Sequence, residues 1–397
     1  MSNSQSWRPF IMVSLALIMG TIGTALASPL YPIYQNVWNL IPSQITYIFV
    51  AYMFGCLATL LFLGRTSNSF GFLRTLQIGI CFVILGLGLS IIAPNALSLS
   101  LARFIIGIAS GLISTSAMLG LFSTIPDSHK NSAAQFSSII TVIGFGLGPI
   151  TGGVIAQYSK TPLITPYIPI IVGAIICLIG LLNIKVPHIK PQPFSLAPHL
   201  QLPKPQFKLL FYISGFTAFS AFASFSLFAS LAPSFVKDAI PWHGPLVSGI
   251  AISSILLVSA IVQFFAKSIP SKTCVKAGLV TFILSFILLA LCMTMHWSAL
   301  FFISDILVGV GHGLSLIGAF SFIHIMTDLN NRAAIMSTYL FVGYLGTIIP
   351  IVGVGFIADY LGLISGVVGF CIVIGILCLY LLLLLNKTMI SQHHQPN

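Results

Sequence analysis

The sequence predicts an all-α membrane protein in which twelve transmembrane helices form two pseudo-symmetric six-helix bundles. Three observations predict this fold class. The composition does not suit a water-exposed surface, because 57% of the 397 residues are hydrophobic and only 5% are charged, against about a quarter in soluble domains. Twelve apolar runs are long enough to cross a bilayer. The two halves of the chain also repeat one another at a nearly constant spacing.

The twelve runs follow one another along the whole chain. A membrane helix needs about 20 mostly apolar residues. Runs of that size lie at 10–32, 44–64, 74–93, 97–123, 134–157, 164–184, 208–236, 244–266, 273–294, 298–325, 332–357 and 361–386. The first run is too long for the core of a signal peptide and lacks a cleavage site, so it is predicted to be the first membrane helix.

Charged residues predict the orientation of these helices. Lys and Arg are retained on the cytoplasmic side of a membrane protein. With the N-terminus inside, thirteen of them flank the helices on one side, and only Lys160 and Lys237 lie on the other. The sequence therefore predicts a multi-pass protein of a bacterial-type inner (plasma) membrane with both termini in the cytoplasm. The basic residues lie singly between apolar runs, so nucleic-acid binding is not expected.

A proline-rich stretch divides the chain in the middle. Residues 185–207 are polar and hold six prolines, which cannot continue a helix and predict an extended cytoplasmic linker. Residues 1–184 are then the N-terminal six-helix bundle, and 208–397 are the C-terminal bundle with a short cytoplasmic tail. The seven cysteines have no CxxC spacing, so neither a disulfide framework nor a metal site is expected, and no motif calls for a cofactor.

The two halves match one another over several helices. A shift of about 200 residues brings similar residues together: Arg65 and Lys267, Arg74 and Lys276, Gly107 and Gly309, Gly111 and Gly313 by 202, Pro149 and Pro350, Gly152 and Gly353 by 201, and Pro29 and Pro233 by 204. Repeats of six helices are typical of transporters in which two bundles rock around a site at the membrane midplane.

Three local motifs carry a resemblance to a known family. The loop after the second run contains Gly64, Asn68, Gly71 and Arg74, the fourth run contains Arg103 followed by Gly107 and Gly111, and the fifth contains Gly144, Gly148, Pro149, Gly152 and Gly153. The chain resembles the major facilitator superfamily over essentially its whole length, with Asn68 in place of the loop's usual acid. The fifth-helix motif is similar to that of the drug–proton antiporter branch, which implies export. Together with Pro350, the loop and fifth-helix residues are predicted to serve gating and conformational change, and packing by small residues is the alternative.

Three ionisable residues stand well inside the predicted helices, namely Arg103, Asp305 and His312. Such residues usually line a cavity, form pairs or carry protons. The shift of 202 places Asp305 at the position of Arg103, and the resemblance implies that the two face each other across a central cavity. We expect Asp305 to carry the coupled proton, with Arg103 beside it. His312, two helical turns further on, relays the proton or contacts substrate. The alternative is a static Arg103–Asp305 pair.

The resemblance implies that the first, fourth, seventh and tenth helices line this cavity. Polar residues on the first and seventh are the candidates for substrate contact: Thr21, Thr24, Ser28, Tyr31, Tyr212, Thr217, Ser220 and Ser224. Serine and threonine in membrane helices also commonly bond to their own backbone or to a neighbouring helix, which is the alternative.

The predicted function is secondary active export of a small organic molecule, a drug-like compound or secreted metabolite, by proton-coupled alternating access. Its partners are the substrate, protons and the lipid bilayer, and the protein is expected to be a monomer. The scarcity of acids favours neutral or anionic substrates. The alternatives are a proton-coupled importer of a metabolite, a membrane-embedded enzyme and a sensor that has lost transport. No nucleophile with its base is present, so an enzyme is not predicted.

Overall fold

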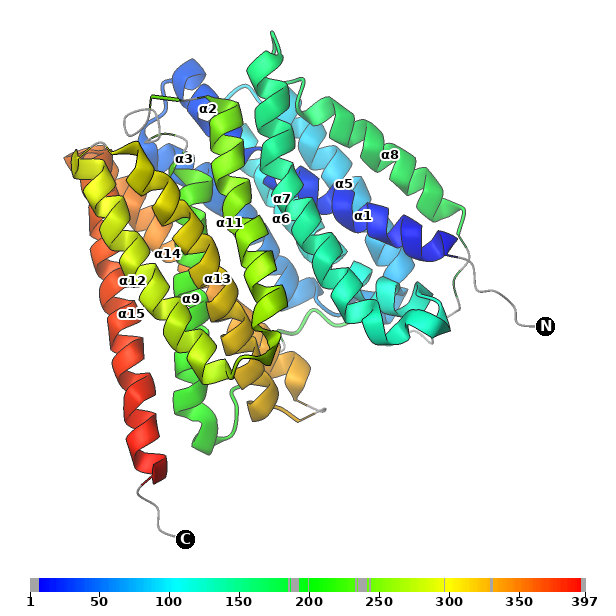
Figure 1. Cartoon of the computed structure of the whole chain (residues 1–397). Coiled ribbons are helices and arrows are strands. Elements are labelled where there is room, and N and C mark those ends of the chain that lie inside the picture. Colours follow the sequence, from blue (N-terminus) through cyan, green and yellow to red (C-terminus); the bar gives the residue numbers. More distant parts are fainter. Residues whose placement is uncertain are drawn as a thin grey trace. The chain divides into compact units, whose positions relative to one another are not determined.

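The computed structural model describes residues 7–184, 186, 193–198, 200–232, 234, 241–242, 244–295, 297–328 and 331–393. Within these ranges the chain forms helices and no strand (Figure 1). Eleven of the described helices are long and apolar enough to cross a membrane. The predicted all-α membrane class is confirmed. Lys185, Lys190, Pro233 and Lys237 lie outside the described residues, so the predictions that involve them are not tested.

The helix in the run 164–184 is shorter than predicted. It is α8, Tyr167–Leu182, with 16 residues, which corresponds to about 24 Å of helix. It begins late because the preceding residues form turns. Thr161 accepts backbone hydrogen bonds from Ile164 and Thr165, both at 3.0 Å, and Pro166 occupies the N-cap.

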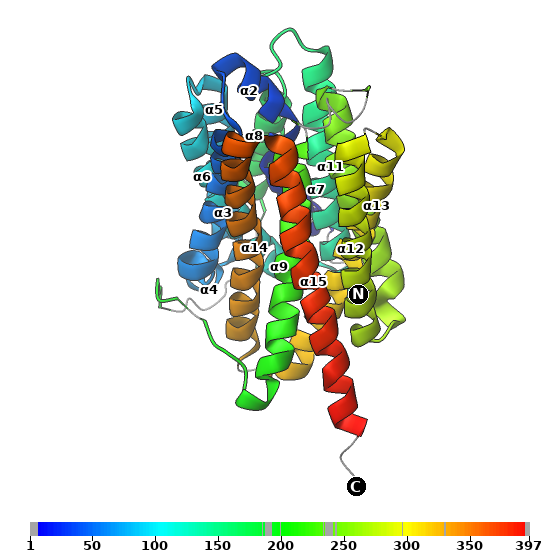
Figure 2. The same ribbon diagram turned by 90° about the vertical axis from the view of Figure 1, so that its left-hand side faces the viewer.

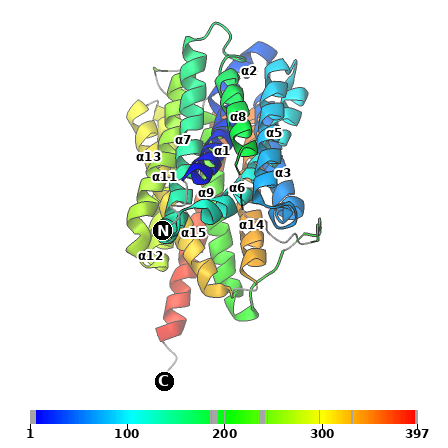
Figure 3. The same ribbon diagram turned by 90° about the vertical axis from the view of Figure 1, so that its right-hand side faces the viewer.

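The chain forms two compact units. Unit 1 comprises Met1–Leu40, Tyr47–Pro198 and Gly244–Ser253. Its long helix α1 lies between α7 and α8 in Figure 3, and it packs against both. The helices that supply unit 1 are α1 (Arg8–Ala25), α2 (Tyr31–Trp38), α3 (Pro42–Ala58), α4 (Thr66–Phe70), α5 (Phe72–Ile92), α6 (Ala96–Thr124), α7 (Ala133–Tyr158) and α8, with a π-helical turn at Thr59–Leu63 and 3₁₀ turns at Ser28–Leu30 and Asp127–Ser132.

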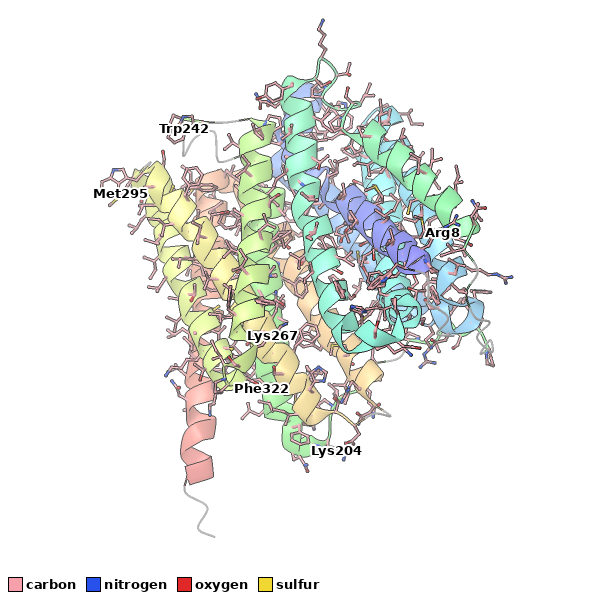
Figure 4. The ribbon with its side chains drawn as sticks, turned by 45° about the vertical axis from the view of Figure 1, so that its right-hand side comes forward. Arg8, Lys204, Trp242, Lys267, Met295 and Phe322 are labelled. Atoms are coloured by element: carbon pink, nitrogen blue, oxygen red, sulfur yellow. The ribbon has the colours of Figure 1, made fainter. Side chains whose placement is uncertain are left out.

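Unit 2 comprises Ile41–Thr46, His199–His243 and Ser254–Asn397. Its helices α9, α14 and α15 lie side by side (Figure 2) and pack on one another. Lys204 lies at the end of this unit opposite to Trp242 and Met295 (Figure 4). The helices that supply unit 2 are α9 (Lys208–Ser230), α11 (Pro245–Phe265), α12 (Ser271–Met295), α13 (Ser298–Met326), α14 (Arg332–Leu361) and α15 (Leu363–His393), with 3₁₀ turns at Pro205–Phe207 and Ala266–Ser268.

Two helices are divided between the units. The first turn of α3 belongs to unit 2 and the rest of it to unit 1, whereas α11 begins in unit 1 and continues in unit 2. The described part of the predicted linker has no helix before Pro205, and there Gln201 donates its backbone N–H to Thr338 Oγ1 of α14 at 2.9 Å. The assignment of 1–184, 185–207 and 208–397 as bundle, linker and bundle stays a prediction.

The glycine motif of α7 packs on both sides within unit 1. A Cβ atom at Gly148 would lie 2.8 Å from Ala25 Cβ of α1, and one at Gly152 would collide with the Leu26 carbonyl. On the other side, Gly153 lies against the backbone of Pro245 at the start of α11. Small residues let helix backbones approach this closely. The motif therefore serves close helix packing in this structure.

The fourth helix of each half packs in the same way on the second helix of that half. Gly107 of α6 lies against the Tyr52 backbone of α3, and Gly309, its equivalent at a shift of 202, lies 2.9 Å from the Ile255 carbonyl of α11, measured from an added Cβ. Gly111 and Gly313 repeat this relation one turn further on, against Thr59 and Ser259. The sequence repeat is thus a repeat of helix contacts.

The equivalent glycines Gly152 and Gly353 give a matched test of this packing. A methyl group at Gly152 meets the Leu26 carbonyl, whereas one at Gly353 meets nothing within 4 Å. We expect Gly152→Ala to lower the free energy of unfolding by about 1–3 kcal/mol. Gly353→Ala is expected to be neutral or to stabilise by up to about 1 kcal/mol, because it adds helix propensity. Thermal unfolding of the two purified variants checks this, and equal melting temperatures would contradict it.

The first turn of α3 is held by a carboxylate from α14. Asp359 Oδ1 accepts the backbone N–H of Ser43 at 3.1 Å, and Gly355 of α14 leaves room for Ser43 and Thr46. The first N–H groups of a helix have no partner within it and attract negative charge. Asp359 therefore caps α3 from another helix.

Removing this cap is expected to weaken the attachment of α3. We expect Asp359→Ala to lower the free energy of unfolding by about 1–2 kcal/mol, the usual range for a lost cap. Asp359→Asn keeps an acceptor but loses the charge, so it is expected to cost less than 1 kcal/mol. Melting temperatures at matched pH measure both, and an Asn variant as unstable as the Ala variant would assign the effect to the charge alone.

Candidate functional site

The centre of unit 1 is built around Arg103 on α6. This helix begins with a capping box, in which Asn95 Oδ1 accepts the Ser98 N–H at 3.0 Å and Ser98 Oγ accepts the Asn95 N–H at 3.3 Å. Arg103 follows two turns later, and only 1% of it is exposed. The cap fixes where α6 starts, and Arg103 lies eight residues after the capping residue Asn95.

The end of α1 supplies one partner of this guanidinium. α1 ends at Ala25, before the 3₁₀ turn that contains Pro29. The last carbonyls of a helix lack internal partners, and one of them, Thr24 O, accepts a hydrogen bond from Arg103 Nη1 at 2.8 Å. A cation at a helix C-terminus is favourable. Arg103 of α6 therefore stabilises the C-terminal end of α1, and the break in α1 provides the carbonyl that the arginine binds.

Tyrosines surround the rest of the guanidinium. The Tyr52 ring of α3 lies under it, 5.1 Å from Cζ to the ring centroid. The side chain of Tyr31 interacts directly with Arg103. The distances and angles do not complete a hydrogen bond at either the Tyr31 hydroxyl or Arg103 Nε within the described residues. The hydroxyl groups of Tyr34 and Tyr167 form a hydrogen bond with each other at 3.0 Å, close to Tyr31. We call Arg103, Tyr31, Tyr34, Tyr52 and Tyr167 the arginine–tyrosine cluster.

Unit 2 has a carboxylate where unit 1 has this arginine. Asp305 on α13 is 2% exposed. Its Oδ2 accepts a hydrogen bond from Ser254 of α11, and its Oδ1 has no hydrogen-bond partner among the described residues. No described Lys, Arg or His forms an ion pair with it. Asp305 is therefore a buried acid held by one hydroxyl.

His312 lies two turns further along α13 and is also held by a serine of α11. Gln263 Nε2 donates to Ser259 Oγ at 3.0 Å, and Ser259 Oγ lies 2.8 Å from His312 Nδ1. The Ser259 hydroxyl has two lone pairs and one proton, so it can accept from Gln263 and either donate to Nδ1 or accept from it, according to the tautomer of His312. The rings of Phe222 and Phe225 of α9 flank the imidazole at 6.4 and 6.1 Å between centroids.

The two buried charges occupy equivalent places in the repeat. Arg103 contacts Tyr52, and Asp305 contacts Ser254. Both pairs are related by the same shift of 202 residues, and each joins the fourth helix of a half to the second. The repeat therefore places a side-chain contact at equivalent positions in the two units. In unit 1 it joins a cation to an aromatic ring, and in unit 2 it joins an acid to a hydroxyl group.

The structure does not test the expected Arg103–Asp305 pair. The two residues belong to different units, and each has partners within its own unit. The facing arrangement stays a prediction. The sequence reasoning did not single out Tyr34, Tyr52, Tyr167, Ser254, Ser259 and Gln263, although the shift of 202 applied to Tyr52 and Ser254 would have indicated that pair.

The cavity candidates divide into two groups. Four of them donate to the carbonyl four residues earlier in their own helix, at 2.7–2.9 Å, as the alternative expects: Thr21, Thr24, Ser220 and Ser224. Of the others, Ser28 and Tyr31 are buried at the break after α1, and Thr217 is buried with no hydrogen-bond partner among the described residues. Tyr212 is 37% exposed and lies against Phe216 at 4.5 Å between rings. Their role in substrate contact stays a prediction.

The profile of the Major Facilitator Superfamily matches residues 13–351. The chain belongs to the Major Facilitator Superfamily. The family and its fold are those of transporters, so this chain is a multi-pass membrane transporter of some substrate and not an enzyme. The alternative of a membrane-embedded enzyme is thereby removed.

Curated relatives within the superfamily match only in part. The riboflavin transporter RibZ of Clostridioides difficile (strain 630) is 23% identical over 188 residues, which is 47% of this chain and 41% of RibZ. The uncharacterized MFS-type transporter EfpA of Mycobacterium tuberculosis (strain ATCC 25618 / H37Rv) is 24% identical over 157 residues, which is 38% of this chain and 30% of EfpA. The matches span less than half the length of these relatives.

Solved structures of the superfamily share the fold over the whole chain. A bacterial homolog of the human lysosomal transporter Spinster, in an inward-facing and occupied conformation, has a TM-score of 0.71 at 14% identity over 98% of each chain. A mutant of the nucleoside transporter NupG has a TM-score of 0.69 at 16% identity, over 96% of this chain and 98% of that chain. At these identities the likeness concerns the fold alone.

The superfamily's loop between the second and third membrane helices is α4 with its flanks. Gly64 ends the π-helical turn before α4, and Gly71 ends α4 with a φ of +82°, a conformation that favours glycine. Asn68 and Arg74 are both exposed. Gly148, Gly152 and Gly153 pack as described above, and a Cβ atom at Gly144 would collide with Thr21 of α1. Pro149 and Pro350 lie inside α7 and α14. Their part in gating stays a prediction.

Proposed function

We propose that this transporter exports a small organic molecule in exchange for protons, by alternating access, with Asp305 as the proton carrier. The observation that carries the proposal is the state of its carboxylate. One oxygen is held by Ser254 and the other has no hydrogen-bond partner among the described residues. A bare carboxylate inside a membrane protein is costly and usually functional.

Opening and closing of the transporter would change the hydration of this group. In the closed surroundings described here, burial penalises the charged form of a carboxyl group. Contact with water removes that penalty. Asp305 can therefore hold a proton while buried and release it when its side of the transporter opens to the cytoplasm, which couples proton movement to conformation.

His312 is proposed as the second proton group. Its Nδ1 is held by Ser259, which is itself held by Gln263, so Nε2 is the nitrogen that can pass a proton or meet a substrate. The spacing from Asp305 is seven residues on α13, about 10 Å along the helix. A chain of waters or a polar substrate can bridge that distance, whereas a direct hydrogen bond or a single water cannot.

The direction of transport is inferred from α7. Its sequence from Gly144 to Gly153 resembles the motif of the drug–proton antiporter branch, and antiport with protons entering drives export. The gating residues of the α4 loop, α7 and α14 are proposed to bend or slide as the halves alternate. A location in the bacterial plasma membrane with both termini in the cytoplasm fits the bias of basic residues. The protein is proposed to act as a monomer.

The first substrates to try come from the relatives. RibZ is a riboflavin transporter and NupG a nucleoside transporter, so riboflavin and nucleosides are suitable labelled probes. If neither moves, the extracellular metabolites of a deletion strain compared with its parent supply the next candidates.

Inverted membrane vesicles test direction and coupling together. With an acidic lumen, we expect uphill accumulation of the exported compound that a protonophore abolishes. Accumulation only in right-side-out vesicles with acid outside would show a proton-coupled importer instead. Binding of the compound without net movement in either preparation would show a sensor that has lost transport.

A further inference from the structure

The positive charge at the centre of unit 1 has no counter-charge in that unit. The sequence of unit 1 contains a single acidic residue, Asp127. Asp127 lies on the exposed 3₁₀ turn after α6, where it forms an ion pair with Lys130 at 2.5 Å. Within unit 1 Arg103 is buried without an acid, and a buried charge without a counter-charge is strongly unfavourable. A ligand that brings a negative charge would remove this cost.

The hydrogen-bonding groups of the arginine–tyrosine cluster point to the same kind of ligand. Arg103 Nε and the Tyr31 hydroxyl are both buried, and neither has a partner among the described residues. Buried polar groups are normally satisfied. Two donors beside one positive charge match the two oxygens of a carboxylate, which forms strong charge-assisted bonds with arginine. A dianionic phosphate would leave an excess negative charge.

Aromatic rings make up the rest of the surroundings. Tyr52 lies against the guanidinium, and the Phe49 ring meets the Tyr31 ring edge to face at 6.4 Å between centroids. Aromatic rings prefer such offset or edge contacts with one another. A carboxylate attached to an aromatic ring would therefore find partners for both of its parts.

We propose that the arginine–tyrosine cluster is a binding site for the carboxylate of an aromatic organic anion, and that such anions are the substrate class of this transporter. The assignment of substrate class rests on the proposed export function. The cluster is closed to solvent in this structure, so the anion enters in another state of the alternating-access cycle. Capping of α1 accounts for the bond from Nη1 to Thr24, but it leaves Nε and the hydroxyl proton of Tyr31 available to a ligand.

Equilibrium binding without any ion gradient tests the site. The probes are benzoate, 2-naphthoate and indole-3-acetate, each paired with its neutral amide, and the readouts are thermal stabilisation and calorimetry of the purified full chain in uncharged detergent. We expect at least one carboxylate to bind more tightly than its amide. Arg103→Gln is expected to weaken that binding by roughly tenfold to a hundredfold, and Tyr31→Phe by roughly threefold to tenfold.

Three controls keep the test decisive. Tyr31→Phe leaves the cap on α1 intact, so it reports on the site even if Arg103→Gln folds poorly. Lys160→Gln removes one exposed positive charge of unit 1 and should bind like the wild type. Uphill transport by Asp305→Asn is measured separately from binding. If this variant still transports uphill, the proposed proton coupling fails, and the anion site is judged by the binding of the other variants alone.

Two outcomes would overturn the proposal. One is that no carboxylate stabilises the wild type more than its amide does. The other is a preference for carboxylate that survives unchanged in both Arg103→Gln and Tyr31→Phe, which would place the anion elsewhere.

Discussion

Asp305→Asn is expected to reduce uphill transport by roughly a hundredfold or more, the scale at which removal of a proton-transferring group acts. Asparagine keeps the size of the side chain and an oxygen that can accept from Ser254, so folding should be preserved. It cannot take up and release a proton. Movement of the substrate down its own gradient should therefore continue while accumulation driven by a pH gradient disappears.

Two measurements separate these activities. Accumulation in acid-loaded inverted vesicles reports coupled uphill transport, and counterflow without a pH gradient reports movement of the substrate alone. Ser254→Ala is the matched control, because it removes the hydrogen bond but leaves the acid. We expect this variant to keep coupled transport and to shift its dependence on pH. An Asp305→Asn protein that still accumulates substrate against a gradient would refute the assignment of Asp305 as the proton carrier.

The helices could largely be predicted from hydropathy, because the bilayer sets their length. The runs 74–93 and 97–123 became α5 and α6, Phe72–Ile92 and Ala96–Thr124, and they separate at the capping residue Asn95. The first run was less well predicted. It contains the break after Ala25 and continues to Trp38, because a short interruption at Pro29 scarcely changes the mean hydropathy.

The candidate site could be predicted only in part. Rarity of charge in apolar runs was enough to single out Arg103, Asp305 and His312, since buried charges are costly. Their partners depend on how each helix is rotated and how deep it lies, which a hydropathy pattern does not record. Ser259 and Gln263 lie one turn apart on α11, but their contact with His312 of α13 depends on how the two helices are rotated. Tyr31, Tyr34 and Tyr167 reach the surroundings of Arg103 from other helices and turns, so only the folded structure brings them together.

Exchanging the two buried charges is expected not to restore transport. The variants Arg103→Asp and Asp305→Arg should each lower accumulation by roughly tenfold or more. Arg103→Asp loses the charge-assisted bond to the Thr24 carbonyl, and Asp305→Arg loses the proposed proton carrier. If the two residues paired directly, the double variant would regain much of the activity of the wild type. Uphill flux in inverted vesicles, corrected for the amount of folded protein, measures this.

The reason for expecting no recovery lies in the neighbours of each charge. An arginine at position 305 would meet Ser254 in place of the Tyr52 ring, and an aspartate at position 103 would face the Thr24 carbonyl, which repels it. Double-mutant cycles between Arg103 and Tyr52, and between Asp305 and Ser254, should then show coupling, because residues in contact are non-additive. Near-additive effects within these pairs, together with recovery in the exchanged double variant, would instead support a direct Arg103–Asp305 pair. In that case the opposite charges at equivalent places in the repeat act as one ion pair. If there is no recovery, the two residues have separate functions, with anion recognition by Arg103 in unit 1 and proton transfer by Asp305 in unit 2.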